Sequence, residues 1–249
     1  MASTLSATKF TAPFVCAWLV ALLAVPVCAD LKWKLELPGE VEWSKVVWTG
    51  SLLVGAKDHI TLISPDGSLM WSRTDLKNLA PFNVQSVPGS DAIVVSELVS
   101  KIPMRARLSV LNLATGETRW KTDPTMGSNL GGYPIPERDL VLFARDMQGG
   151  QGVKAGANLS AFNLNSGEVL WTQRLGSMGS LPSHVSDSGG FIPTTDLSGH
   201  PPPVIQGDLF IWQAGDLFAV DLTSGELRWR YKLKAKNPQL KNAFARPIV

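Results

Sequence analysis

Residues Leu217 to Tyr231 read LFAVDLTSGELRWRY, and this pattern decides the fold because it recurs along the chain. It predicts a short apolar strand, a tight turn at Gly225 and a second strand that carries Trp229. Repeats of this kind determine an architecture more strongly than any single-residue motif does. The other copies are LSVLNLATGETRW at 108–120, LSAFNLNSGEVLW at 159–171 and a looser ITLISPDGSLMW at 60–71.

In every copy a glycine lies four residues before a tryptophan. Glycine permits turn geometries that a β-carbon resists. A tryptophan on the outer strand is large enough to fill the gap between one sheet and the next, since a buried aromatic side chain removes about 150–250 Å² from water. The predicted structural residues are the turn glycines Gly67, Gly116, Gly167 and Gly225 and the repeat tryptophans Trp33, Trp71, Trp120, Trp171 and Trp229.

Two further short apolar segments precede each copy, which makes four predicted strands per repeat. We find no convincing helical period of apolar residues, so the sequence predicts an all-β chain. Four-stranded antiparallel units that repeat every 40–50 residues or so are typical of a β-propeller, whose blades bury both faces against their neighbours. The predicted blades are roughly 41–74, 83–123, 130–175 and 202–233, with the start of a further blade at 240–249.

The two ends of the repeat do not match each other. Trp33 to Leu37 resembles an outer strand without the rest of its blade, and 240–249 resembles an opening strand that nothing follows. We therefore expect about four blades plus an N-terminal closing strand in an incomplete ring, as part of a longer propeller. Closure by dimerisation or strand exchange is the alternative.

The first 29 residues differ in kind from the rest. Lys9 is their only charge, an apolar run covers Phe14 to Val25, and small or modest side chains precede Asp30. This pattern predicts a signal peptide at 1–29, because the run is shorter than the ~20 residues that span a membrane. A retained anchor and a lipoprotein signal with Cys28 as the modified residue are the alternatives.

Both cysteines, Cys16 and Cys28, lie in this leader, so the domain at 30–249 has no thiol or disulfide. The chain is predicted to be exported, in the first place to the periplasm, with secretion or a secretory lumen as alternatives. No transmembrane span is predicted for the mature chain. The formal net charge is +2, without a block of like charge, which argues against nucleic acid as a partner.

The pattern strand–Thr/Ser-Gly-Glu-x-x-Trp resembles the PQQ-type (quinoprotein-like) propeller repeat, over about 31–233. Within that family, the chain is closest in kind to non-enzymatic exported propellers such as the propeller subunit of the outer-membrane barrel-assembly machinery. The resemblance implies a scaffold that binds another protein, in envelope or outer-membrane protein assembly. It equally allows a fragment of a PQQ-dependent alcohol or sugar dehydrogenase, and a sensor or receptor domain in a eukaryotic secretory lumen is a third alternative.

The enzymatic alternative finds little support in the residues. The resemblance implies adjacent cysteines and calcium ligands beside the quinone in alcohol-oxidising members, and the mature chain has no cysteine. We predict no cofactor, with PQQ and calcium as the alternative. The residues favour a non-enzymatic protein over an enzyme. The oxygen ligands that could hold a hard cation are Glu97, Asp146, Asp187 and Asp196, which no spacing singles out.

No other motif predicts chemistry. The histidines His59, His184 and His200 share no ligand spacing. The glycine-rich Gly149 to Gly156 lacks the Gly-Lys-Ser/Thr ending of a phosphate loop. We therefore predict neither a catalytic residue nor a metal site.

What remains is binding through loops. The segment 177–202 and the segment 99–105 carry apolar residues among turn formers, and loops of this kind contact partners or fold back on the ring. The predicted partner contacts are Ile102, Met104, Met178, Leu181, Phe191 and Ile192. The sequence does not identify the partner or the total number of blades.

Overall fold

The computed structural model describes residues 33–37, 39–57, 59–76, 79–147, 156–176, 184–185, 191–192, 203–214 and 216–232. The chain divides into two compact units, Met1–Lys34 and Leu35–Val249, and every strand lies in the second. The predicted signal peptide lies outside the described residues. Within the described part of the chain, no helix is long and apolar enough to cross a membrane.

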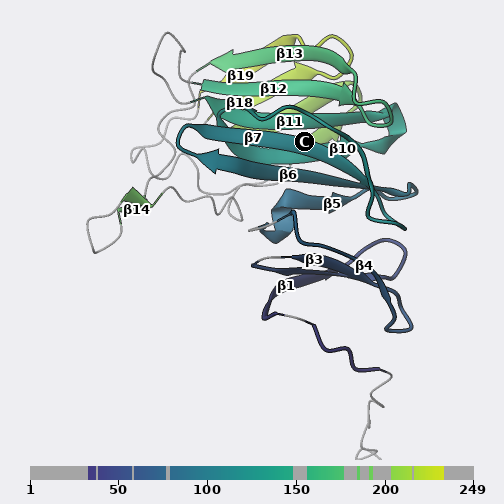
Figure 1. The fold of residues 1–249 in the computed structure, drawn as a ribbon. Helices are drawn as coiled ribbons and strands as arrows, with labels where there is room; N and C mark the ends of the chain where they lie inside the picture. The colour runs from purple at the N-terminus through teal and green to yellow at the C-terminus, as the bar shows by residue number, and fades with distance from the viewer. Residues whose placement is uncertain are drawn as a thin grey trace, which may run out of the picture. The chain divides into compact units, whose positions relative to one another are not determined.

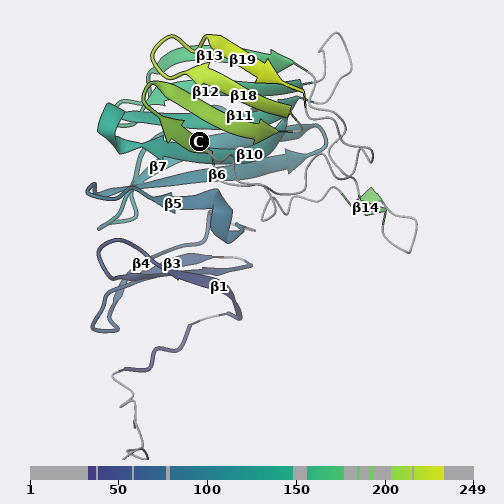
Figure 2. The ribbon, with the colours of Figure 1, turned by 180° about the vertical axis from the view of Figure 1, so that it is seen from behind.

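Four antiparallel sheets follow one another along the chain (Figures 1 and 2). In each, consecutive strands are hydrogen-bonded neighbours, which is the meander of a propeller blade. No sheet among the described residues closes on itself, so the prediction of an all-β, incomplete propeller with four blades is confirmed. The strands are β1 (Val41–Val46), β2 (Leu52–Ala56), β3 (Ile60–Ile63) and β4 (Leu69–Arg73) in the first sheet; β5 (Val84–Ser86), β6 (Ala92–Lys101), β7 (Met104–Asn112) and β8 (Thr118–Lys121) in the second; β10 (Ser128–Ile135), β11 (Leu140–Met147), β12 (Gly156–Asn163) and β13 (Val169–Gly176) in the third; and β16 (Val204–Gln206), β17 (Leu209–Ala214), β18 (Asp216–Asp221) and β19 (Leu227–Tyr231) in the fourth.

Short elements join the sheets. The 3₁₀ turns η1 (Pro81–Asn83) and η2 (Pro136–Arg138) precede β5 and β11. The two-residue strand β9 (Thr125–Met126) pairs with β7, and β14 (His184–Val185) pairs with β15 (Phe191–Ile192).

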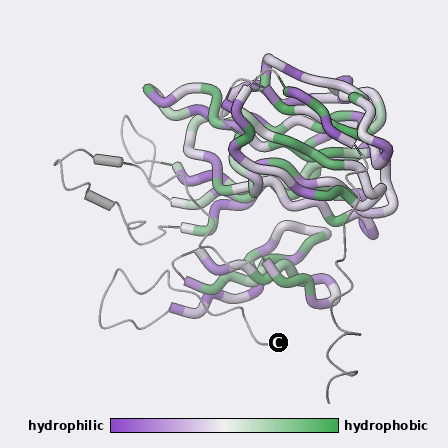
Figure 3. Tube along the Cα trace, turned by 90° about the horizontal axis from the view of Figure 1, so that it is seen from below, coloured by the Kyte–Doolittle hydropathy of each residue, from purple (hydrophilic) through white to green (hydrophobic). Residues whose placement is uncertain are grey.

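Apolar side chains of consecutive sheets meet in three clusters, which follow the green stretches of the strands in Figure 3. Between the first and second sheets, Leu62 packs with Ile93. Val94 of the second sheet shares a cluster with Phe143 of the third, and Leu142 of the third shares one with Phe210 of the fourth. Each sheet therefore buries apolar side chains against the sheet that follows it, as a propeller blade must.

The repeat tryptophans add a polar bond to this packing. The Trp71 indole N–H donates a hydrogen bond of 2.8 Å to the Leu113 carbonyl of the next sheet, and its ring lies over Gly116. A β-carbon at Gly116 would lie only 2.7 Å from the Trp71 ring. We call this arrangement the Trp–Gly contact. It recurs from Trp120 to Leu164 O and Gly167, and from Trp171 to Leu222 O and Gly225, with both hydrogen bonds at 2.9 Å.

The turn glycine thus meets two requirements at once. At Gly116, φ is +72°, in the region that side chains with a β-carbon avoid. The indole of the preceding sheet also occupies the space that a β-carbon would need. Sequence reasoning identified the first requirement, whereas the second depends on a residue 45 positions earlier in the chain, Trp71.

A side chain at the start of each turn fixes the backbone. The Asn112 Oδ1 accepts hydrogen bonds from the N–H groups of Ala114 and Thr115, at 2.8 and 3.1 Å. Asp221 does the same for Thr223 and Ser224, and these bonds help to hold its pKa well below the usual range. The Asn/Asp-Leu-x-Thr/Ser-Gly order in the repeat is therefore a turn motif whose first side chain positions the glycine.

The predictions for the two ends of the repeat, a closing strand at 33–37 and an opening strand at 240–249, stay predictions. Residues 33–37 do not form a strand in the structure, and their pairing with a last blade stays untested. Gly67 has the left-handed φ of its counterparts, +88°. Trp229 is 41% exposed, and the segment 240–249 lies outside the described residues.

Replacing Gly116 by Ala should separate the two requirements on the turn glycine. Gly89 has the same φ, +72°, but nothing lies within 4 Å of its β-carbon position. We expect Gly89→Ala to lower the free energy of unfolding by about 1–2 kcal/mol, from backbone strain alone. Gly116→Ala should lower it by about 2–5 kcal/mol, because the clash with the indole adds about 1–3 kcal/mol. Equal losses in urea unfolding would contradict the Trp–Gly contact as a constraint.

Truncating a repeat tryptophan tests the Trp–Gly contact by removing the indole instead of altering the glycine. Trp171→Ala should cost about 3–5 kcal/mol of unfolding free energy, because it removes buried ring area and leaves the Leu222 carbonyl without its donor. Trp229→Ala should cost about half as much or less, because that ring is 41% exposed. Thermal and urea unfolding of both variants measure the difference, and a larger loss for Trp229→Ala would refute the assignment.

Candidate partner-binding site

Strands β6 and β7 extend well beyond their neighbours. β5 pairs with β6 only at Ile93–Val95, and β8 pairs with β7 only at Ser109–Leu111. The two strands continue to pair with each other as far as Lys101 and Met104. Residues 96–108 therefore form a projecting hairpin, which ends at Ile102.

The short strand β9 braces the projecting hairpin. Met126 pairs with Arg105, and Thr125 pairs with Ala106. The Gly127 N–H donates to the Met104 carbonyl at 3.0 Å, so the brace continues to the first residue after the turn. The hairpin is thus held on the side of β7 by main-chain bonds and is more rigid than an ordinary loop.

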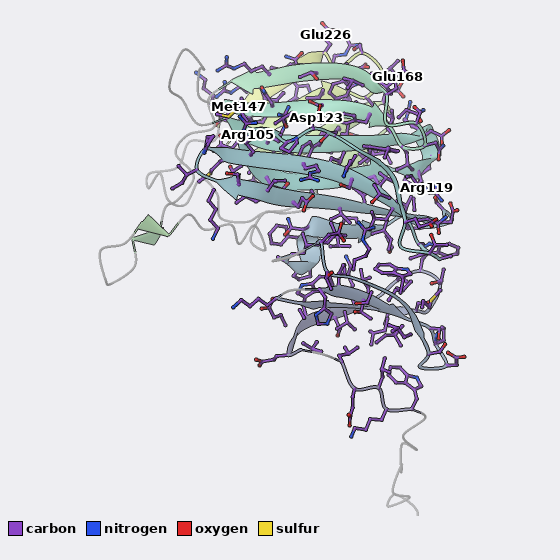
Figure 4. The ribbon with its side chains drawn as sticks, in the orientation of Figure 1. Arg105, Arg119, Asp123, Met147, Glu168 and Glu226 are labelled. Atoms are coloured by element: carbon purple, nitrogen blue, oxygen red, sulfur yellow. The ribbon has the colours of Figure 1, made fainter. Side chains whose placement is uncertain are left out.

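Apolar side chains are exposed where the hairpin and its brace meet. Ile102 is 94% exposed, Val99 40% and Met126 42%. The sequence places Lys101 and Arg105 beside them, and Figure 4 shows Arg105 at the end of the strands where β6 turns into β7. We define the rim patch as Val99, Lys101, Ile102, Arg105 and Met126.

Arg145, near the end of β11, lies next to the rim patch. Its Nη1 contacts the Met126 carbonyl at 3.3 Å and its Nη2 contacts the Ser160 hydroxyl at 3.4 Å. Its Nε is buried without a hydrogen-bond partner, and the guanidinium carbon lies 5.5 Å from the centre of the Phe143 ring. Burial lowers the pKa of Arg145, which means that the surroundings disfavour its charge.

Glu97 and Arg107 form an ion pair nearer the base of the hairpin. They are directly opposite each other in the β6–β7 register, with 3.3 Å between Arg107 Nε and a Glu97 carboxylate oxygen. They alternate with Ala106 and Leu108, which are in the cluster shared with the third sheet. Burial raises the pKa of Glu97, and the nearby Arg107 charge only partly offsets this effect.

Two of the acidic residues considered as cation ligands lie in the described part of the chain. Glu97 is paired with Arg107, and Asp146 lies on β11, where burial raises its pKa. Asp187 and Asp196 lie outside the described residues. The described ranges contain no group of three His, Cys, Asp or Glu side chains that could hold a metal ion.

Of the three histidines, only His59 has a described side chain. His59 is buried, at 3% exposure, just before β3. His184 belongs to β14, and His200 lies outside the described residues. Of the Gly149 to Gly156 loop, only Gly156 is described, as the first residue of β12.

The predicted contact residues have different outcomes. Ile102 is almost fully exposed, whereas Met104 is partly buried at the start of β7. Phe191 and Ile192 form β15, and Met178 and Leu181 lie outside the described residues. Sequence reasoning did not find Met126 or Arg145. The only sequence signal for Arg145 was its position directly after the apolar run Leu140–Ala144.

The comparisons with known proteins agree with this architecture. The model of the family described as outer membrane protein assembly factor BamB matches residues 56–249. The chain belongs to this family. No curated protein matches the sequence.

Several solved structures are similar to this BamB-family chain. BamB from Moraxella catarrhalis is 13% identical with a TM-score of 0.47, over 80% of this chain and 51% of that one. A europium-containing methanol dehydrogenase is 16% identical with a TM-score of 0.46, over 78% and 44%. The computationally designed Ika8 protein is 13% identical with a TM-score of 0.49, over 77% and 49%. The chain therefore spans about half the length of these proteins.

Replacing Glu97 by Gln should change how stability depends on pH. The folded pKa of Glu97 lies above its ordinary value, so ionisation of this carboxyl destabilises the fold. As pH rises from the ordinary carboxyl value of about 4.3 through the folded pKa, the wild type should lose stability relative to Glu97→Gln.

Asp75 is the matched control because Arg73 lowers its pKa. Ionisation of Asp75 stabilises the fold, so Asp75→Asn should lose stability relative to the wild type as pH rises from the folded pKa of Asp75 to the ordinary value of about 3.9, just below the range in which Glu97 acts. Urea unfolding between about pH 3 and pH 7 distinguishes the two signs. A pH-independent difference for Glu97→Gln would contradict the raised pKa.

Proposed function

We propose that this BamB-family chain is a non-catalytic, exported scaffold that binds another protein through the rim patch. The observation that carries the proposal is the 94% exposure of Ile102 at the end of a braced hairpin. The family description supports a role in outer-membrane protein assembly, and with it a periplasmic location after removal of residues 1–29.

Physical chemistry favours a binding role for this position. Ile102 gains nothing from burial in the chain itself, although a buried isoleucine side chain is worth about 1.5–3 kcal/mol. Val99 and Met126 extend the exposed apolar surface around it. Exposed apolar groups that are held together on a rigid element and surrounded by polar residues are typical of protein contact sites.

The rest of the hairpin supports this proposal. Its base carries the Glu97–Arg107 pair and contributes Ala106 and Leu108 to the core between the second and third sheets. Only the end of the hairpin is free of structural contacts of this kind, so substitutions there can test binding without changing the fold.

A photoreactive amino acid at position 102 of the full chain should cross-link a specific envelope protein in the cells that encode it. Val169 is the matched control, because it is an exposed apolar residue (57%) on β13, away from the hairpin. We expect one defined cross-linked product from position 102 and none of that size from position 169.

Ile102→Asp should abolish co-purification of the cross-linked protein, while the melting temperature stays within about 1 °C of the wild type, because the side chain buries almost no area. Val169→Asp should retain the partner. Identical cross-links from both positions, or full retention of the partner by Ile102→Asp, would refute the rim patch as the binding site.

A further inference from the structure

The cations around the rim patch have no acidic partner in the described part of the chain. Lys101 and Arg105 flank Ile102 in the sequence, and the Nη1 of Arg145 contacts the Met126 carbonyl. The ion pairs of the described residues involve none of these three side chains. Lys101 and Arg105 are solvated by exposure, but Arg145 is half-buried.

Two acidic residues on the same strands, Glu97 and Asp146, do not pair with these cations. Glu97 is engaged by Arg107, the residue directly opposite it in the β6–β7 register. Asp146 follows Arg145 directly in β11, so the two side chains point to opposite faces of the sheet. Burial raises the pKa of Asp146, whereas a salt bridge to Arg145 would lower it.

Arg145 is therefore an incompletely satisfied cation. Its hydrogen bonds to Met126 and Ser160 are long, and its Nε has no acceptor. A half-buried guanidinium without a carboxylate is costly, because its lost hydration is only partly replaced. The arrangement would be completed by an anion that approaches beside Met126.

We propose that the rim patch binds an acidic segment of a partner protein, whose carboxylates pair with Arg105 and Arg145 while an adjacent apolar side chain packs on Ile102 and Met126. This inference rests on the proposed function and adds the chemistry of the partner. Arginine suits the role because its planar guanidinium binds a carboxylate through two parallel hydrogen bonds.

A protein segment fits this site better than an anionic membrane surface does. The hairpin tip could touch a flat surface, but Arg145 is half-buried and its guanidinium contacts the Met126 main-chain carbonyl. A carboxylate on a flexible side chain can reach such a group, whereas headgroups in the plane of a bilayer favour long, exposed lysines and arginines.

The test uses the full chain and two fluorescent twelve-residue peptides. In one peptide Asp and Leu alternate, and in the other Lys replaces every Asp. Anisotropy should show binding of the acidic peptide only, and the affinity should fall steeply with salt. Arg145→Gln and Arg105→Gln should each weaken it about 10-fold, as expected for loss of a charge-assisted hydrogen bond.

The controls separate binding from folding. Arg145→Lys should retain part of the affinity because it keeps the charge. Arg228→Gln, an arginine of β19 in the fourth sheet beside the turn at Gly225, should bind like the wild type. Melting temperatures identify any variant that is merely destabilised. Equal binding of both peptides, or unchanged affinity in Arg145→Gln, would overturn the proposal.

Two further outcomes are distinguishable. If vesicles containing phosphatidylglycerol bind the chain and the acidic peptide does not, the proposal is overturned in favour of a lipid surface. If position 102 cross-links a protein whose retention is unaffected by Arg145→Gln, the acidic segment is refuted while the scaffold function stands. If position 102 cross-links no protein, the proposed function itself fails.

Discussion

The structure depends on one interaction, the contact between a tryptophan of one sheet and a turn glycine of the next. A four-stranded sheet has two apolar faces and no means of burying them within itself. Packing alone would leave the sheets free to slide, because apolar contact has little directionality. The indole N–H removes that freedom by bonding to one carbonyl of the next sheet, as Trp71 does with Leu113. Because the same contact recurs at Trp120 and Trp171, the relation between consecutive sheets is repeated as well.

The regular part of this arrangement could be read from the sequence. The Gly-x-x-x-Trp spacing and the apolar alternation predicted four-stranded sheets, and the structure contains them. The glycine was assigned to a turn for the correct reason, since Gly116 has φ of +72°. Its second role was not predictable from local sequence, because the indole over it belongs to the preceding sheet. The Asn112 side chain that shapes the turn was visible in the pattern, but its hydrogen bonds had to be seen.

The candidate site was less predictable because it interrupts the repeat. Ile102 attracted notice as an apolar residue in a loop, whereas the structure shows it at the end of two long paired strands. The brace came from β9, a two-residue strand too short to leave a periodic pattern. Arg145 joins the site from the next sheet, 43 residues after Ile102. Contacts of this range follow from the way sheets are stacked, which no local pattern encodes.

Some arginines of this fold form ion pairs within the chain, whereas others have no acidic partner in its described part. Arg119 bonds to Asp91 and Arg138 to Asp208, and in both pairs the partner precedes or begins a strand. The two acids are in comparable positions, directly before β6 and β17, although Arg119 belongs to the same sheet as its acid and Arg138 to the preceding one. At the opposite end of the second and third sheets the sequence repeat no longer applies, because the hairpin at 96–108 extends past the strands that the repeat predicts. The cations found there, Arg105 and Arg145, have no acid supplied by the repeat, and their free charge is a consequence of the same irregularity that exposes Ile102. A departure from the repeat thus creates both the apolar and the electrostatic part of the proposed site.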